Sequence, residues 1–170
     1  MNRMVSIAIL CLAFAACRQV PVVDVEQQQG DTLAAHTATA NRYLSQGEET
    51  QIEAYIERRG WTMQRLTGGI RVMETSVGKG IRIDYEDTVT IVYDLETISG
   101  QTIYTGVTDT VVIGRMEPTR GLDAALRTLH RGSEATVIVP SALAYGVVGD
   151  ADRITTRMIL VYKLKINQQT

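Results

Sequence analysis

The side chains of this sequence that are suited to chemistry are chiefly tyrosines set among apolar residues. Tyr93 and Tyr162 each stand in a stretch rich in aliphatic residues, and Tyr145 stands in a short segment between Ala144 and Gly146. A phenol in such surroundings offers a hydroxyl that can donate or accept a hydrogen bond while remaining uncharged. The pattern indicates an apolar, tyrosine-bearing site rather than one built on a nucleophile and a base.

The motifs that mark phosphate loops, serine-hydrolase elbows and zinc proteases are absent from the sequence. Residues 146–149 have glycine spacing but lack the Lys-Ser/Thr pair of a phosphate loop. Asp150 and Asp152 have the spacing of a calcium loop, but its later glycine and its final glutamate are missing. His36 and His130 lie far apart and form no pair. We therefore expect no metal site and no cofactor.

The composition is typical of a globular protein. The chain has 170 residues, of which 45% are hydrophobic and 21% are charged, and its formal net charge is −2. This slightly acidic balance argues against a nucleic-acid partner. No apolar stretch reaches the roughly 20 residues that a bilayer-spanning helix needs.

Residues 1–16 are predicted to be a signal peptide. Arg3 is followed by an apolar run that ends in small residues directly before Cys17, and the motif AFAAC resembles the lipobox of bacterial lipoproteins. Phe14 departs from that family, which usually has Leu there. The resemblance implies that Cys17 is acylated and becomes the first mature residue. The alternative is plain secretion, with cleavage after the alanine-rich stretch.

Residues 17–30 are predicted to be the lipidated cysteine followed by a flexible tether. The segment is rich in Gln and has no helical period. Arg18 and Gln19 are not acidic, which by analogy with lipoprotein sorting signals argues against retention in the inner membrane. We expect a cell-envelope protein, lipid-anchored in the outer membrane and facing the periplasm.

Residues 31–81 are predicted to form a helical segment and a lead-in hairpin. A first helix is expected from Asp31 to about Leu44, and a second over residues 48–59 with Gly60 at its C-terminal cap. The apolar stripe of the second helix consists of Ile52, Tyr55 and Ile56. It either mediates dimerisation or partner binding, or packs on the chain's own domain, and its shortness favours packing.

From Trp61 onward the hydrophobic pattern changes to a period of two, which is typical of strands. One helix is expected near residues 122–129, between Gly121 and Gly132. Strands are expected over residues 62–66, 70–74, 88–95, 101–105, 110–113, 134–139 and 158–166. The sequence thus predicts an α+β fold in which an antiparallel sheet wraps one short helix.

Residues 82–167 resemble an FKBP-type peptidyl-prolyl isomerase domain. The resemblance is carried by GSEATVIVPSALAYGVVGDADRITTRMILVYKLKI at 132–166, by IVYDLETISGQTIY, and by IGRMEPTRGLDAALRTLHRG. The segment NRYLSQGEETQIEAYIERRGW is similar to the helical lead-in of FKBP-type lipoproteins associated with gliding motility. The resemblance implies an antiparallel sheet around one helix and the isomerisation of X–Pro peptide bonds.

The resemblance also implies the site residues. The family's pocket tyrosines or aromatics correspond to Tyr93, Tyr145 and Tyr162, which are the expected catalytic positions. The positions expected to bind substrate are Ile103, Pro118, Thr119, Leu122 and Ile154. The implied partners are proline-containing segments of exported proteins, and the lipid membrane through Cys17.

Several positions depart from the family pattern. Ile103 and Tyr104 stand where the family has Phe-Asp, Leu122 replaces the Trp of the pocket floor, and Pro118 has no N–H to donate. The departures predict a weak isomerase that assists the folding of exported proteins. The alternative is a non-catalytic chaperone or binding module on the same scaffold within an envelope assembly.

Overall fold

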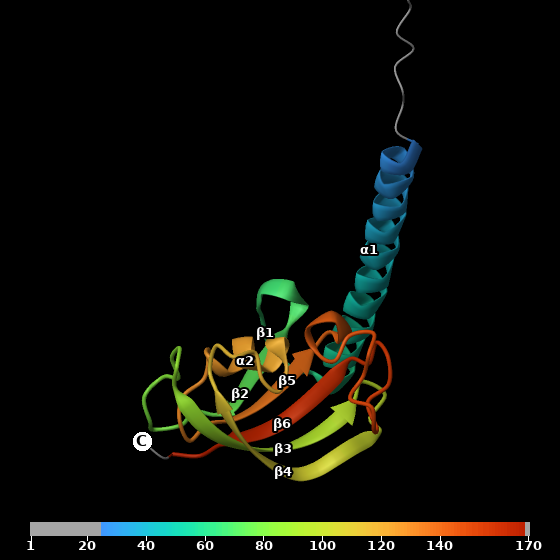
Figure 1. Ribbon diagram of the computed structural model, residues 1–170. Helices are drawn as coiled ribbons and strands as arrows, with labels where there is room; N and C mark the ends of the chain where they lie inside the picture. The colour runs from blue at the N-terminus through green and yellow to red at the C-terminus, as the bar shows by residue number, and fades with distance from the viewer. Residues whose placement is uncertain (1–24, 169–170) are drawn as a thin grey trace, which may run out of the picture. The chain divides into compact units, whose positions relative to one another are not determined.

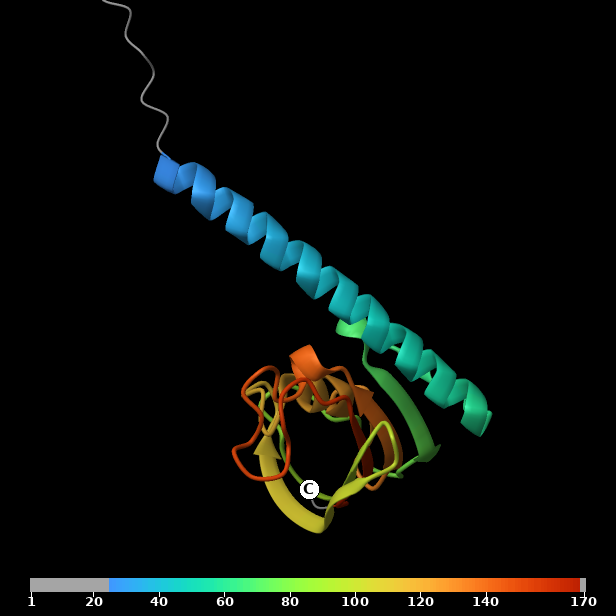
Figure 2. The same ribbon diagram turned by 90° about the vertical axis from the view of Figure 1, so that its right-hand side faces the viewer.

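The computed structural model describes residues 25–168 (Figures 1 and 2). The predicted signal peptide, the predicted acylation site Cys17 and the first part of the predicted tether lie outside these residues. The chain divides into one unit that ends at Thr39 and a second that begins at Ala40. Among the described residues, no helix combines the length and the apolarity that crossing a membrane requires.

Helix α1 (Val25–Arg59) is a single helix of 35 residues. The predictions of a tether continuing to residue 30 and of two separate helices are therefore wrong. The expected break lay around Gly47, but a glycine only lowers helix stability, by about 1 kcal/mol relative to alanine, and does not forbid a helix. The flanking hydroxyls of Ser45 and Thr50 donate to carbonyls four residues back, as helix-compatible side chains do.

The C-terminus of α1 matches the prediction. Gly60 has a φ of +63°, and Trp61 donates its N–H to the carbonyl of Ile56 at 3.2 Å. A glycine tolerates this left-handed conformation because it has no Cβ, so it ends the helix without strain.

Six antiparallel strands form one sheet, in the order β1-β2-β5-β6-β3-β4. The strands are β1 (Gln64–Arg65), β2 (Arg71–Ser76), β3 (Thr88–Thr97), β4 (Thr102–Val112), β5 (Glu134–Val139) and β6 (Leu160–Ile166). The turn Thr67–Gly69 joins β1 to β2, so the predicted hairpin is confirmed. An antiparallel sheet with one short helix agrees with the predicted fold class.

Strand β4 corrects a second prediction, because residues 101–105 and 110–113 were expected to be separate strands. They belong to one strand that contains a bulge, at which the pairing with β3 shifts register between Tyr93 and Leu95. Gly106 lies in this bulge with a φ of +63°, and its N–H donates to Asp94 Oδ1 at 2.8 Å. The bulge accommodates the extra residue in β4 and the break in its hydrophobic alternation, so the strand continues past it.

Helix α2 (Arg120–Leu126) is the short helix around which the sheet curves (Figure 2). Thr119 caps it, accepting a hydrogen bond from the N–H of Leu122 at 3.2 Å on its hydroxyl oxygen. Leu122, Ala125 and Leu126 are fully buried and pack in one core with the inward residues of the strands. The helix ends at Leu126, three residues before the predicted end.

The last turns of α1 pack against a second apolar cluster. Ile52 and Tyr55 are buried with Ile138, Ile159 and Val161, while Ile56 is partly buried beside them. The side chain of Arg71 is 3% exposed and pairs with Glu49 and Glu53 of α1. The stripe of α1 thus packs on the chain's own sheet, as the shortness of the stripe indicated.

Candidate active site

Tyr93 and Tyr162 face each other from neighbouring strands. β3 and β6 are paired, with Tyr162 opposite Leu95, and the ring centroids of the two tyrosines are 5.3 Å apart at an interplanar angle of 61°. This edge-to-face arrangement is a favourable aromatic contact. Burial, with smaller effects of Tyr145 and Asp109, raises the pKa of Tyr93 to about 12, so its phenol is neutral at physiological pH.

Tyr145 completes the group, which we call the tyrosine cluster (Tyr93, Tyr145 and Tyr162). It lies in the loop after β5, is half-buried, and packs against the core that holds the other two tyrosines. Burial raises the pKa of Tyr145, and the negative charges of Asp150 and Asp109 raise it further. The hydroxyls of the cluster are therefore neutral at physiological pH and lie in or against the apolar core.

Tyr162 carries a buried hydroxyl that has no hydrogen-bond partner among the described residues. Its side chain is fully buried, and burial raises its pKa; Tyr145 adds to this rise, whereas the neighbouring hydroxyl of Thr119 opposes it. Leaving a buried polar group unpaired typically costs about 1–3 kcal/mol. Because the hydroxyl of Tyr162 is fully buried, the expected effect of leaving it unpaired is a lower stability of the folded protein.

The predicted substrate-binding positions do not all have the same surroundings. Ile103, Leu122 and Ile154 are buried in the core that contains Tyr93 and Tyr162. Thr119 is buried and caps α2, whereas Pro118 is only half-buried and is not part of that core. Three of the five positions thus share the core of Tyr93 and Tyr162, and a fourth, Thr119, has its hydroxyl next to that of Tyr162.

A polar link between β4 and the loop after β5 was not found from the sequence. The hydroxyl of Tyr104 donates to Asp150 Oδ2 at 2.6 Å and lies 3.1 Å from Asp152 Oδ2. Asp150 Oδ1 also accepts from the N–H of Ile154 at 2.7 Å. The signal in the sequence was the pair Asp150 and Asp152, whose carboxylate oxygens accept hydrogen bonds from Tyr104 and from the backbone of the loop. Among the described residues no group of acidic, His or Cys side chains could hold a metal ion.

The residues beside this link shape the edge of the site. The guanidinium of Arg153 lies 5.2 Å from the ring centroid of Tyr104 and donates to the carbonyl of Ile103 at 3.1 Å. A hollow of about 300 Å³ is lined by Ile103, Arg153 and Met158, among others. Of these residues, Ile103 belongs to the core that contains Tyr93 and Tyr162, and Met158 packs against that core.

Asp109 is a second residue that the sequence analysis missed. On β4 it lies opposite Ile91, and Val107 lies opposite Tyr93. Directly opposed residues in an antiparallel pair share one face of the sheet. Because Ile91 and Tyr93 are buried on the concave face, Asp109 is an acidic residue at an inward position, diagonal to Tyr93. Only the strand register could have revealed this.

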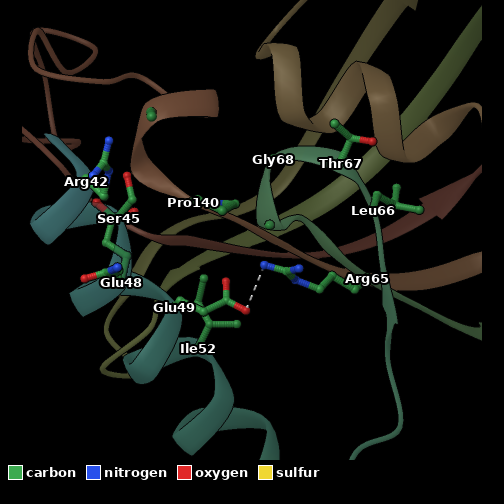
Figure 3. Close-up of a pocket in the computed structure, with 13 residues that line it drawn as sticks. Arg42, Ser45, Glu48, Glu49, Ile52, Arg65, Leu66, Thr67, Gly68 and Pro140 are labelled. Carbon is green, nitrogen blue, oxygen red and sulfur yellow. Dashed lines mark ion pairs between the residues drawn. The ribbon is translucent and has the colours of Figure 1, made fainter. Parts of the chain in front are cut away.

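A larger hollow, of about 480 Å³, lies away from the tyrosine cluster (Figure 3). One wall is α1, with Glu48, Glu49 and Ile52, and the other is formed by residues 65–69 and Pro140. We call it the α1 groove. No tyrosine lines it, and its Arg65 and Glu49 pair with each other at 3.3 Å. Its residues do not suit prolyl isomerisation, so the larger hollow is not the candidate active site.

A curved antiparallel sheet around one helix, with Tyr93 and Tyr162 buried in the same core as the helix, is typical of an FKBP-like domain. The sequence profile of FKBP-type peptidyl-prolyl cis-trans isomerases matches residues 79–167, which is about half of the chain. The chain belongs to this family of enzymes.

The chain is also similar to a curated protein and to solved structures of the same family. The chain is 26% identical over 156 residues to a probable FKBP-type peptidyl-prolyl cis-trans isomerase, FkpA, of Neisseria meningitidis serogroup B. That match covers 88% of this chain but only 54% of the relative, so the chain spans about half the length of that protein.

The structural neighbours show the fold. A peptidyl-prolyl cis-trans isomerase from Pseudomonas syringae pv. tomato has a TM-score of 0.61 at 21% identity, covering 74% of this chain and 92% of its own. The N-terminal domain of FKBP42 from Arabidopsis thaliana has a TM-score of 0.57 at 20% identity, covering 62% and 90%.

Proposed function

We propose that this protein catalyses cis–trans isomerisation of X–Pro bonds in exported polypeptides. The observation that carries the proposal is the convergence of Tyr93, Tyr145 and Tyr162 on the apolar core around Leu122, where burial raises the pKa of each phenol and keeps it uncharged. Family membership supports the same reaction.

The reaction needs no nucleophile or base. Rotation about the peptide bond breaks amide resonance, and the barrier is about 18–20 kcal/mol. An apolar environment disfavours the dipolar planar amide relative to the twisted form, in which resonance is lost. In this mechanism the apolar side chains of Leu122 and Ile154 hold the proline ring, and the hydroxyl of Tyr145 donates to the carbonyl of the twisted bond.

We propose that turnover is slow. Leu122 offers less flat contact area for a proline ring than an aromatic floor would. The missing contact corresponds to about 1–2 kcal/mol, and each 1.4 kcal/mol is about tenfold in rate.

We further propose that the protein is anchored in the outer membrane through acylated Cys17 and faces the periplasm. The motif before Cys17 and the non-acidic residues after it support this. The test is incorporation of a labelled fatty acid into the full chain in a bacterial host, compared with Cys17→Ser. Equal labelling of both proteins would contradict the anchor.

The activity is tested with a set of X–Pro peptides and the purified full chain in mild detergent. Acceleration by the wild type that falls about tenfold in Tyr145→Phe, the usual size for one lost hydrogen bond in the transition state, supports the proposal. Tyr43→Phe is the matched control, because Tyr43 is 70% exposed on α1. No acceleration with any peptide, from a folded chain, would refute it.

A non-catalytic chaperone or binding module within an envelope assembly is the second candidate. The fixing of the loop after β5 by Tyr104 and Asp150 favours it, because a rim held by hydrogen bonds can bind a segment without turning it over. In that case proline-containing peptides bind the chain, with affinity that falls in Tyr145→Phe, although isomerisation is not accelerated.

A further inference from the structure

Helix α1 is hydrogen-bonded to the loop that carries Tyr145 through one carboxylate. Glu48 Oε2 accepts from the backbone N–H of Ser141 at 3.0 Å, and Glu48 Oε1 accepts from the hydroxyl of Ser141. Ser141 is only 4% exposed, so both bonds are shielded from solvent. Hydrogen bonds to a charged acceptor in such a position are stronger than neutral ones.

Ser141 is a position at which the local sequence supplies no cap. It begins the short helical turn η2 (Ser141–Leu143), and Pro140 before it makes no side-chain hydrogen bond to the turn. The first N–H groups of a helical turn have no partner within it. Glu48, which is 93 residues away in the sequence, provides the missing acceptor.

The bonds continue from Ser141 to the residues on both sides of Tyr145. The carbonyl of Ser141 accepts from the N–H of Ala144 at 3.1 Å and from the N–H of Gly146 at 2.9 Å. The carbonyl of Gly146 in turn accepts from Arg157 at 2.7 Å. The backbone on either side of Tyr145 is therefore fixed by groups that depend on the placement of Ser141.

The α1 groove leaves few other contacts between α1 and the Tyr145 loop. Its open space lies between α1 and the start of the loop, where Pro140 and Ala142 line it (Figure 3). Between residues 40–59 and residues 140–149, Glu48 makes the only hydrogen bonds that the structure describes. The remaining anchors of α1, such as the pairs of Arg71 with Glu49 and Glu53, hold it to β2 instead.

We propose that Glu48 is a positioning residue, which holds the Tyr145 loop in its active geometry and so couples α1 to the active site. This inference rests on the proposed isomerase function. Coupling of this kind is reciprocal, so a peptide that engages Tyr145 also strengthens the contact between α1 and the loop.

The first test compares kcat and KM of the full chain with those of Glu48→Ala, Glu48→Gln and Glu49→Ala. Glu48→Ala lowers kcat about tenfold with little change in KM, since one charge-assisted contact is lost from the active geometry. Glu48→Gln retains an acceptor oxygen and recovers part of this loss. Glu49→Ala weakens the anchor of α1 to β2 but leaves kcat unchanged. An equal fall in kcat in Glu49→Ala would overturn the proposal.

The second test is a double-mutant cycle with Tyr145→Phe. If Glu48 acts through Tyr145, the combined variant loses less activity than the product of the two single losses, because Tyr145 is already misplaced. Independent, multiplicative losses would overturn the proposal.

Amide hydrogen exchange separates this proposal from the isomerase function. In Glu48→Ala, residues 141–149 exchange faster, while residues 134–139 of β5 keep the wild-type rate and Glu49→Ala leaves residues 141–149 unchanged. If the wild type is inactive but exchange responds in this way, positioning stands and the isomerase function fails. If the wild type is active and neither kcat nor exchange responds to Glu48→Ala, the positioning proposal fails alone.

Discussion

Replacing Tyr162 by Phe should stabilise the folded protein and lower the rate of peptide isomerisation. The hydroxyl of Tyr162 is buried, and within residues 25–168 no group lies in hydrogen-bonding geometry to it. Removing an unpaired buried hydroxyl relieves a desolvation penalty of about 1–3 kcal/mol. The neighbouring hydroxyl of Thr119 offsets part of that penalty, so we expect a gain near the lower end, about 1 kcal/mol.

The matched control for this prediction is Tyr55→Phe. The hydroxyl of Tyr55 is also buried and unpaired among the described residues, but it belongs to the separate cluster under α1. Its removal should give a similar gain in stability without any change in isomerisation. The two variants thus separate relief of an unpaired hydroxyl, which both share, from a change within the tyrosine cluster, which only Tyr162→Phe makes.

Both quantities are measured on the same preparations. Urea unfolding gives the free-energy difference, and a gain of about 1 kcal/mol corresponds to a rise in Tm of roughly 2–4 °C for a chain of this size. Peptide isomerisation gives the rate, which should fall in Tyr162→Phe and not in Tyr55→Phe. A loss of stability in Tyr162→Phe would refute the reasoning, because it would mean that the hydroxyl is already hydrogen-bonded in the folded protein.

Three further predictions concern separate parts of the fold. Ile52→Ala should lower the free energy of unfolding by about 2–3 kcal/mol, since it empties a fully buried position, whereas the exposed Gln51→Ala should not; equal unfolding midpoints would contradict the packing of α1. Asp109→Asn should lower kcat/KM about threefold to tenfold for peptides with Lys beside the proline, because a half-buried carboxylate near Tyr93 attracts a cation. For peptides with Ala at that position kcat/KM should fall much less. An equal fall for both peptides would contradict this. Burial tends to raise the pKa of Asp150, but hydrogen bonds from Tyr104 and the backbone outweigh it and lower the pKa. The ionised carboxylate of Asp150 therefore stabilises the fold above its ordinary pKa, and this contribution is lost as pH falls through the lowered pKa of the folded protein. Asp150→Asn should lower the free energy of unfolding at pH 7 and not in strong acid. A difference in unfolding free energy that does not depend on pH would refute this.

The sheet and its core were predictable because they depend on local pattern. Val89, Ile91 and Tyr93 alternate in the sequence, and the same residues are buried in β3. The hairpin around Thr67–Gly69 and the cap at Gly60 follow from the conformational freedom of glycine, which is also local.

What could not be predicted depends on pairing between distant segments. Asp109 shares a face with Tyr93 only because of the register of β4 on β3, and a one-residue shift would turn it outward. The bond of Glu48 to Ser141 joins segments 93 residues apart. The continuity of α1 was not predictable for a different reason, because an acidic pair such as Glu48 and Glu49 is typical of the first turn of a new helix but is equally compatible with a helix interior.

The bulge in β4 also affects the tendency of the folded protein to aggregate with unfolded polypeptides. β4 is an edge strand of eleven residues, and a long, regular edge invites strands of other molecules to pair with it and aggregate. At the bulge, Gly106 donates its N–H to the side chain of Asp94, so the regular row of backbone donors is interrupted. An acidic residue, Asp109, follows three positions later. A protein that handles extended polypeptides can thus carry a long open edge without becoming a template for β-aggregation.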